Sequence, residues 1–437
     1  MYKLVELEIE KFDDYVRNHK QKSHFLQSAA WGKLAKAKKN LYPYYVGLID
    51  ENNDIVGATL LLQKKLPLNL SYFYAPRGYV IDFHNKDLLK IMTEQVIKFI
   101  KTKKGIFLKI DPDLVINSSD YEGKENIPEY NREETLKNIE ACGFKHLGFT
   151  KNFETSQPRY SFRIDLTQQE DEIENHFSKT TKQRINKALK LNTKVEIGTK
   201  KDLETFHRLM MLTEDRKGFV SYNLDYYETL YDLFNESDKA TLFIGKVNLS
   251  EIIDIYQQDY KEIEDNINKI DKENISKSSK NKLKELEKRK ENIEQYINKY
   301  TEAKINFGNE IILNAHMIVE YGNKAWVLYA GNHNILMETY SNYHTYYKHL
   351  KFCYDRKLDI YDQFGTIGDL SKENSKLGLH EFKKKFGGDY VEFIGEFDYI
   401  IKPMWYFAFN KLIPFYRNII KRKSKKNLQS KINNENN

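Results

Sequence analysis

The feature that most constrains the fold is an order of strand-like and helix-like segments that occurs twice along the chain. In the first copy, short runs rich in β-branched and aromatic residues flank a segment of helical periodicity at 86–101. The second copy begins at 161–166 (SFRIDL). Each copy ends in a helical segment stopped by glycine, LKNIEACGFKHLG (136–148) and LHEFKKKFGG (379–388), with a strand-like segment after it. The pattern predicts an α/β (α+β) chain with two domains of one architecture.

A segment of different character interrupts the second copy. Its apolar residues recur at heptad spacing in two runs. The positions are Tyr256, Tyr260, Ile263, Ile267 and Ile270 in the first run and Leu283, Leu286, Ile293, Ile297 and Tyr300 in the second. Turn residues at 274–281 (NISKSSKN) separate the runs, which predicts an antiparallel coiled-coil hairpin.

The charge of this hairpin indicates a partner. The heptads alone fit a solvated spacer equally well. Residues 277–290, however, hold seven basic and two acidic side chains at the expected tip of the arm. A positive tip favours contact with a polyanion, and the phosphate backbone of RNA is the common one.

Taken together, the patterns predict four parts in the 437-residue chain, which is longer than a usual single-core domain. The first domain is expected at 1–155 and the second at 156–250 and 306–402. The arm at 251–305 is inserted in the second domain, and an amphipathic and basic tail follows at 403–437.

The positive charge of the chain is concentrated in this tail. The formal net charge is +7, and residues 402–437, which are the tail and the lysine before it, hold nine Lys or Arg against one acid. Within the tail, 403–426 joins aromatic and aliphatic residues to the basic cluster KRKSKK. This combination predicts peripheral association with the inner face of the cytoplasmic membrane, through apolar burial and attraction to anionic lipid. The alternative is a terminal helix packed on the domain, followed by a disordered basic end.

Cysteine content and hydropathy indicate a cytoplasmic protein. Cys142 and Cys353 are too few for a disulfide framework and lack metal-ligand spacing. The amino terminus lacks the apolar core of a signal peptide, and no apolar run approaches the length of a membrane span. The sequence also lacks the GxxxxGK[ST], GxSxG, HExxH and CxxC motifs, so we expect no metal and no nucleotide-cradling loop.

Seven segments occur in the order found in the Fem family, which this chain resembles over essentially its whole length. They are QSAAWGKLAK (27–36), YAPRGYVIDF (74–83), LKIDPDLV (108–115), QPRYSFRIDL (157–166), KTTKQRINKALK (179–190), LYAGN (328–332) and GLHEFKKKFGGDYVEFIGEFD (378–398). The resemblance implies two tandem domains related to the GNAT acyltransferase fold. The implied activity is transfer of an amino acid from aminoacyl-tRNA to the stem peptide of a peptidoglycan precursor, either lipid II or UDP-MurNAc-peptide. The arm resembles the tRNA-binding arm of seryl-tRNA synthetase, and no cofactor is implied beyond aminoacyl-tRNA as co-substrate.

The resemblance also implies two catalytic residues. Lys383 aligns with the lysine implicated in catalysis in the family. Phe382, the residue before it, is among the residues implied in substrate binding. A fixed cation at position 383 would stabilise the negative charge of the tetrahedral centre. Asp111 matches an aspartate on the acceptor side that holds the incoming amine or receives its proton. The alternatives are a solvated charge run for Lys383 and a turn-forming Asp before proline for Asp111.

Further residues are implied in substrate binding. Lys36 falls on the lysine that contacts the pyrophosphate of the precursor, where an ammonium offers three donors; the alternative is an ordinary solvated lysine. Lys182 stands where family members usually have arginine, and either it or Arg184 is expected to bind phosphate; the alternative is a solvent-facing amphipathic helix. Tyr329 matches an aromatic position lining the site, with core packing equally compatible.

The substrate-binding set has two further residues, Trp31 and Gly387. Trp31 lies on the same helical segment as Lys36, and we expect it to anchor that segment in the core. Gly387 is expected to let the backbone approach the substrate closely.

Two other functions fit parts of the sequence. An acyl-CoA-dependent N-acyltransferase of the same fold would favour a [QR]xxGx[GA] pyrophosphate turn, and QFGTIGD (363–369) has the wrong spacing. A non-catalytic RNA-binding or membrane-adaptor protein would use the arm and the tail alone.

Overall fold

The chain folds into two compact units. The computed structural model describes residues 2–217, 220–237, 239–270 and 276–412. Unit 1 comprises Met1–Ser161, Gly365–His380 and Asp389–Asn437, and unit 2 comprises Phe162–Phe364 and Glu381–Gly388.

Unit 1 is built on a seven-stranded sheet of order β1-β2-β3-β4-β5-β16-β8. The strands are β1 (Lys3–Glu6), β2 (Tyr42–Ile49), β3 (Ile55–Leu66), β4 (Leu70–Ala75), β5 (Gly105–Ile110), β16 (Phe397–Ile400) and β8 (Phe144–His146). Neighbouring strands are antiparallel except β4 and β5, which run parallel and place Ala75 beside Ile110. A second group of antiparallel strands joins β15 (Asp389–Phe393), β6 (Val115–Ser119) and β7 (Glu125–Asn126).

Four helices of unit 1 pack their apolar sides onto this sheet. They are α1 (Ile9–Asn18), α2 (Ala29–Lys39), α3 (Lys86–Thr102) and α4 (Arg132–Ala141). On α3, the side chain of Asn85 caps the amino terminus, and buried residues at helical spacing, from Leu89 to Ile100, enter the core. The parallel pair β4–β5 is connected through α3, as a crossover between parallel strands requires.

The first five strands of unit 2 repeat the order of the first five strands of unit 1. The strands of unit 2 follow the order β10-β11-β12-β13-β14-β9. Strands β13 and β14 run parallel, and the other neighbouring pairs in this order run antiparallel. The strands are β10 (Lys194–Gly198), β11 (Lys239–Asn248), β12 (Glu310–Tyr321), β13 (Lys324–Asn332), β14 (Ile360–Asp362) and β9 (Tyr160–Asp165). The helices of its body are α5 (Glu170–Asn175), α6 (Lys179–Lys190), α7 (Leu203–Lys217), α8 (Leu224–Ser237), α11 (Ser341–Asp355) and α12 (Leu377–Lys384), the last of which begins in unit 1. This repeated order confirms the prediction of an α/β chain with two domains of one architecture.

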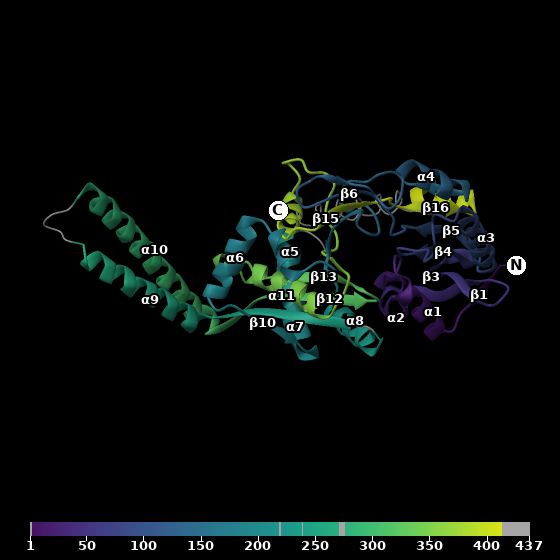
Figure 1. Cartoon of the computed structure of the whole chain (residues 1–437). Coiled ribbons are helices and arrows are strands. Elements are labelled where there is room, and N and C mark those ends of the chain that lie inside the picture. Colours follow the sequence, from purple (N-terminus) through teal and green to yellow (C-terminus); the bar gives the residue numbers. More distant parts are fainter. Residues whose placement is uncertain (1, 218–219, 238, 271–275, 413–437) are drawn as a thin grey trace, which may run out of the picture. The chain divides into compact units, whose positions relative to one another are not determined.

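The connection between β11 and β12 holds two long helices, α9 (Leu249–Asn268) and α10 (Lys277–Phe307), that lie side by side and project from the sheet of unit 2 (Figure 1). Tyr256 stacks on Tyr296 and Tyr300, and Lys290 is hydrogen-bonded to Glu264, so the helices run antiparallel. The heptad positions predicted from sequence supply the seam, with Ile263, Leu286 and Ile293 among its buried residues. The helical hairpin is therefore present; that its helices supercoil stays a prediction.

The end of the chain does not follow the predicted domains. Residues 365–380 and the described residues from 389 to 412 belong to unit 1, whereas the second domain was expected to extend to 402. The reason is strand pairing: β15 pairs with β6, and β16 pairs with both β5 and β8. Local sequence shows that this segment is strand-like but does not specify its partner strands.

The tail begins with α13 (Pro403–Phe407) and a short π-helix, Ala408–Leu412. Met404, Trp405 and Phe407 of α13 are exposed. Most of the predicted membrane-associating segment, from 413 to 426, lies outside the described residues. Among the residues that are described, no helix has the length and apolar character needed to cross a membrane.

Candidate active site

Asp111 lies at the end of the parallel strand pair in unit 1. It follows Ile110 directly, and the residue is 2% exposed. Asp111 Oδ1 accepts a hydrogen bond of 2.7 Å from the backbone N–H of Arg77, and Oδ2 accepts one of 2.8 Å from the Tyr74 hydroxyl. Burial raises the pKa of Asp111 to about 6, against the lowering effect of Arg77. A carboxyl group with this pKa is able to take up a proton near neutral pH.

The Pro76–Gly78 segment that binds Asp111 is held by Gln27. Gln27 is fully buried, and its side chain donates to the carbonyl of Pro76 at 2.6 Å and accepts from the backbone N–H of Leu60 at 2.7 Å. A Cβ at Gly78 would lie 2.9 Å from Gln27 Nε2, so this contact requires glycine. Gln27 therefore fixes the backbone next to Arg77.

Helix α2 positions the predicted pair Trp31 and Lys36. Ser28 caps the helix by accepting from the backbone N–H of Trp31. The Trp31 ring is 6% exposed and packs edge-on against Phe25 at 5.6 Å, as expected of a core anchor. Lys36 is exposed in the last turn, with its Nζ 5.4 Å from the ring centroid of Tyr42. Substrate contact by either residue stays a prediction.

Lys383 is buried in unit 2, where the residue is 5% exposed. Its Nζ donates to two consecutive backbone carbonyls, those of Gln363 at 2.6 Å and Phe364 at 2.8 Å. Burial lowers the pKa of Lys383 to about 7, and the nearby Asp362 carboxylate opposes this shift. The side chain is thus fixed in place and is not part of a solvated charge run.

Sequence reasoning missed the group that faces Lys383. Asp362 ends β14, and its Oδ2 accepts a hydrogen bond of 2.8 Å from Arg163 Nε on β9. The side chain of Gln363 also contacts Lys383, since its Nε2 donates to the backbone carbonyl of Lys383 at 3.1 Å. The available signal was an aspartate at the end of a strand, IYD (360–362), which is also the setting of Asp111.

Phe382 and Arg184 meet at one aromatic ring of unit 2. The Phe382 ring lies edge-on to Tyr343 at 5.1 Å, and the Arg184 guanidinium donates to the Tyr343 hydroxyl. The guanidinium carbon also lies 5.2 Å from the ring centroid of Tyr340. Lys182, two residues earlier on α6, has its Nζ 3.4 Å from Asn175 Oδ1. Arg184 is therefore set among tyrosines, while Lys182 makes only long polar contacts.

Gly387 and Tyr329 make contacts within the fold. Gly387 has a φ of +74°, and a Cβ at this position would lie 2.8 Å from His176 Cβ, so packing alone requires glycine there. Tyr329 belongs to a tyrosine cluster on β13 and α8, where its hydroxyl lies 3.1 Å from that of Tyr226. Burial raises the pKa of Tyr329. Packing accounts for both positions, and their contact with substrate stays a prediction.

The basic tip of the arm is exposed where the structure describes it. Lys282, Lys284, Lys288 and Arg289 on α10 are exposed, whereas Lys290 is hydrogen-bonded to Glu264. Between 271 and 275 the chain lies outside the described residues. The described part of the tip therefore presents a row of cations to solvent.

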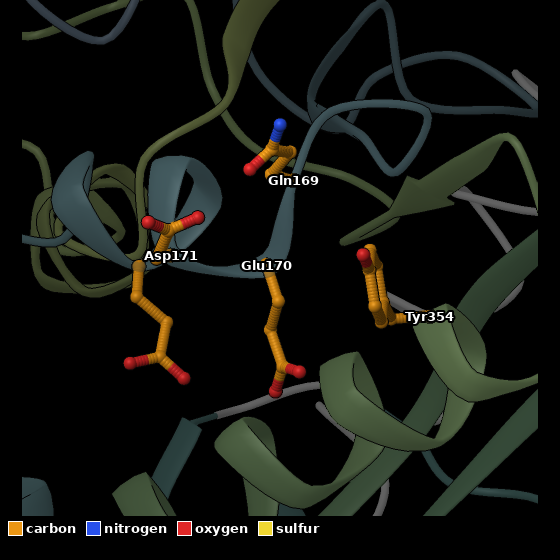
Figure 2. A pocket seen from close by; sticks show the side chains of 5 residues that line it. Gln169, Glu170, Asp171 and Tyr354 are labelled. Carbon is orange, nitrogen blue, oxygen red and sulfur yellow. The ribbon is translucent and has the colours of Figure 1, made fainter.

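A surface pocket of unit 2 has the opposite charge. Figure 2 shows Gln169, Glu170, Asp171 and Tyr354 around it, and Glu174 completes its lining. Glu170 and Glu174 are hydrogen-bonded to Lys351 and Tyr347. None of the predicted site residues lines this pocket, and its carboxylates disfavour a phosphate-bearing ligand. Within the described ranges, no three His, Cys, Asp or Glu side chains are grouped so that they could hold a metal ion.

Comparison with known proteins gives one consistent result. The model of the FemAB family matches residues 7–413. The lipid II:glycine glycyltransferase of Staphylococcus epidermidis (strain ATCC 35984) is 28% identical over 410 residues, covering 93% of this chain and 94% of that protein. The protein of the same name from Staphylococcus haemolyticus (strain JCSC1435) is 29% identical over 412 residues, with the same coverage. Among solved structures, the crystal structure of FemX is 27% identical, covers 92% of this chain and 98% of that chain, and superposes with a TM-score of 0.72.

Proposed function

The chain belongs to the FemAB family, and from this premise we propose that it transfers an amino acid from aminoacyl-tRNA to the stem-peptide amine of a peptidoglycan precursor. Lipid II is the favoured acceptor, because the similar staphylococcal proteins are named for it. The product is a building block for an interpeptide bridge. The observation that carries this proposal is the similarity to those transferases over nearly the whole of both chains.

In the proposed reaction, the acceptor amine attacks the carbonyl carbon of the aminoacyl ester. A C–N bond forms, the ester C–O bond breaks, and the tRNA leaves with its ribose hydroxyl restored. The amine must lose a proton along the way. We assign that proton to Asp111, whose raised pKa suits a base working near neutral pH; the protonated carboxyl then gives the proton to the ribose oxygen as the ester C–O bond breaks.

The tetrahedral centre of this reaction carries negative charge on the former carbonyl oxygen. We assign its stabilisation to Lys383, because a buried and fixed cation acts more strongly than one in water. This role needs the ammonium form. The Asp362 carboxylate supports that form against the effect of burial.

Substrate binding is assigned to the outlying cations. Lys36 contacts the pyrophosphate of the precursor, and Lys182 or Arg184 supplies a second phosphate contact. The exposed cations near the tip of the arm bind the tRNA backbone. The segment 403–426 holds the enzyme at the inner face of the membrane, where lipid II is available.

A transfer assay tests this function against its alternatives. The purified full-length protein is incubated with radiolabelled aminoacyl-tRNA and lipid II in detergent micelles, and the product is identified by mass. We expect label in the stem peptide. Product that forms only with acyl-CoA would support an N-acyltransferase, and RNA binding without any product would support a non-catalytic adaptor. Running charged glycine, alanine and serine tRNAs in parallel identifies the donor amino acid.

A further inference from the structure

The two residues after Asp362 form a turn that is unlike the end of an ordinary strand. Phe364 has a φ of +46°, a left-handed conformation that is unfavourable for a residue with a side chain. Asp362 Oδ1 accepts a hydrogen bond of 2.8 Å from the backbone N–H of Phe364, which closes the turn. The carboxylate therefore stabilises a backbone conformation that the sequence alone disfavours.

This conformation has a direct effect on Lys383. In an extended strand, successive carbonyls point to opposite sides. Here the carbonyls of Gln363 and Phe364 both accept from one ammonium, at 2.6 and 2.8 Å. The turn at Phe364 removes the alternation, so both oxygens face the same point.

The second oxygen of the carboxylate is bound from another strand. Asp362 Oδ2 accepts from Arg163 Nε at 2.8 Å, and the two side chains are 3% and 16% exposed. A charge-assisted hydrogen bond between partly desolvated groups restricts the carboxylate to one orientation. A series of hydrogen bonds thus connects Arg163 on β9 with Asp362 at the end of β14, Asp362 with the turn, and the turn with the ammonium of Lys383.

We propose that Asp362, held by Arg163, is a positioning residue that shapes the Gln363–Phe364 turn into the acceptor that fixes the Lys383 ammonium. The inference deepens the function proposed above and rests on it for its effect on catalysis. Asp362 does not touch the substrate; it acts through Lys383. The positioning itself is a property of the folded chain and is measurable without any substrate.

Asp362→Asn is the informative variant. Asparagine keeps an oxygen that can accept from Phe364, but it loses the charge and turns an N–H donor toward Arg163. We expect kcat to fall ~10-fold or more, while KM for both substrates stays within ~2-fold, since misplacing a catalytic group lowers the rate more than ground-state binding.

Glu320→Gln is the matched control. Glu320 is also a buried carboxylate of unit 2, 7% exposed, and it accepts from Arg356 Nε at 2.6 Å. The same chemical change there removes a similar ion pair without touching Lys383. We expect its kcat to stay within ~2-fold of the wild type.

A second measurement reports on Lys383 without turnover. The proteins are treated briefly with acetic anhydride, and acetylation is quantified by peptide mass spectrometry at Lys383, with the exposed Lys384 as internal reference. Asp362→Asn is expected to raise the acetylation of Lys383 ~5-fold or more relative to Lys384, because the amino group is released from the two carbonyls and reacts with the anhydride as the neutral amine. Glu320→Gln is expected to leave the ratio unchanged.

These measurements separate the inference from the function on which it rests. An unchanged acetylation ratio in Asp362→Asn overturns the positioning role, as does an equal increase in Glu320→Gln. If the wild type lacks transfer activity, the proposed function fails, and acetylation alone decides the positioning role. If circular dichroism shows that Asp362→Asn is unfolded, the milder Arg163→Lys variant replaces it under the same criteria.

Discussion

The two units place a buried aspartate at the corresponding end of the sheet, yet they surround it differently. In unit 1, Asp111 follows the strand that pairs in parallel with β4, and it accepts from a tyrosine hydroxyl and a backbone amide. In unit 2, Asp362 ends the strand that pairs in parallel with β13, and it accepts from the cation of Arg163 and stands near Lys383. Burial raises the pKa of Asp111, against the lowering effect of Arg77 and of both hydrogen bonds, whereas Asp362 serves to hold a cation.

This difference shows how one architecture supports two chemical roles. The strand order fixes where the buried carboxylate lies, and a few neighbouring side chains decide what it does. The link between the second and third strands differs as well: residues 50–54 suffice in unit 1, whereas unit 2 inserts the arm, α9 and α10. We therefore expect unit 1 to supply a base and unit 2 to supply a cation and the RNA contact.

The largest effect is expected from removing the cation of unit 2. Lys383→Met should lower kcat ~10²- to 10³-fold with little change in KM, because a donor that acts on the transition state contributes about that much. Steady-state transfer assays measure this effect. The exposed neighbour Lys384, changed to Met, is the control and should keep its activity. A near-normal rate for Lys383→Met would show that unit 2 does not supply a catalytic cation.

Removing the carboxyl group of Asp111 in unit 1 should lower the transfer activity. It should also increase the stability of the folded chain, relative to the wild type, as pH rises. Asp111→Asn is expected to reduce kcat ~10²-fold through loss of the base. In the folded wild type, the pKa of Asp111 is raised from 3.8 to about 6, so the folded state binds this proton more tightly than the unfolded state. The wild type therefore loses stability, by at most about 3 kcal/mol, as pH rises from 3.8 through 6.

Urea unfolding measures the second part of this prediction. Asparagine does not titrate, so the stability of Asp111→Asn relative to the wild type should increase between pH 5 and pH 8. A difference that stays constant with pH would show that Asp111 has an ordinary pKa in the folded chain, and the base assigned to unit 1 would then lose its support.

Local patterns predicted much of this arrangement. The heptad spacing identified the residues between α9 and α10, and the repeated order of segments identified two domains of one type. Asp111 and Lys383 were predicted from a resemblance of whole motifs. Nothing in the local sequence shows which of the three consecutive lysines, 383 to 385, is buried.

What local patterns did not reveal are contacts between distant segments. The Arg163–Asp362 ion pair joins residues on two strands far apart in the chain, and Gln27 reaches across to Pro76 and Leu60. The strands β15 and β16 likewise pair with unit 1 because of partners that no local spacing specifies. Such contacts depend on the finished fold, and the sequence specifies them only through it.

An intermediate effect is expected at the arm. Replacing Lys282, Lys284 and Lys288 with Gln removes three exposed cations near the tip. KM for aminoacyl-tRNA should rise ~10-fold at physiological salt, and the slope of log KM against log salt should fall by ~2, as expected for three lost phosphate contacts. KM for the precursor should not change.

The control removes the same charge elsewhere in unit 2. Lys201, Lys239 and Lys357 are exposed on its body, and their triple change to Gln should leave the salt dependence intact. Equal effects of the two triple variants would mean that net charge, and not the arm, attracts the tRNA. The arm would then be a structural insertion.

The smallest effect is expected at Lys36, and it tests what unit 1 contributes besides its acid. Lys36 is exposed in the last turn of α2, where water and salt weaken its attraction for phosphate. Lys36→Met should raise KM for the precursor ~5- to 10-fold and leave kcat within ~2-fold, since ground-state binding is lost without transition-state stabilisation. Lys33→Met, an exposed change on the same helix, is the control. Equal losses in kcat and kcat/KM would instead place Lys36 in the chemical step, and unit 1 would then supply a catalytic cation as well as a base.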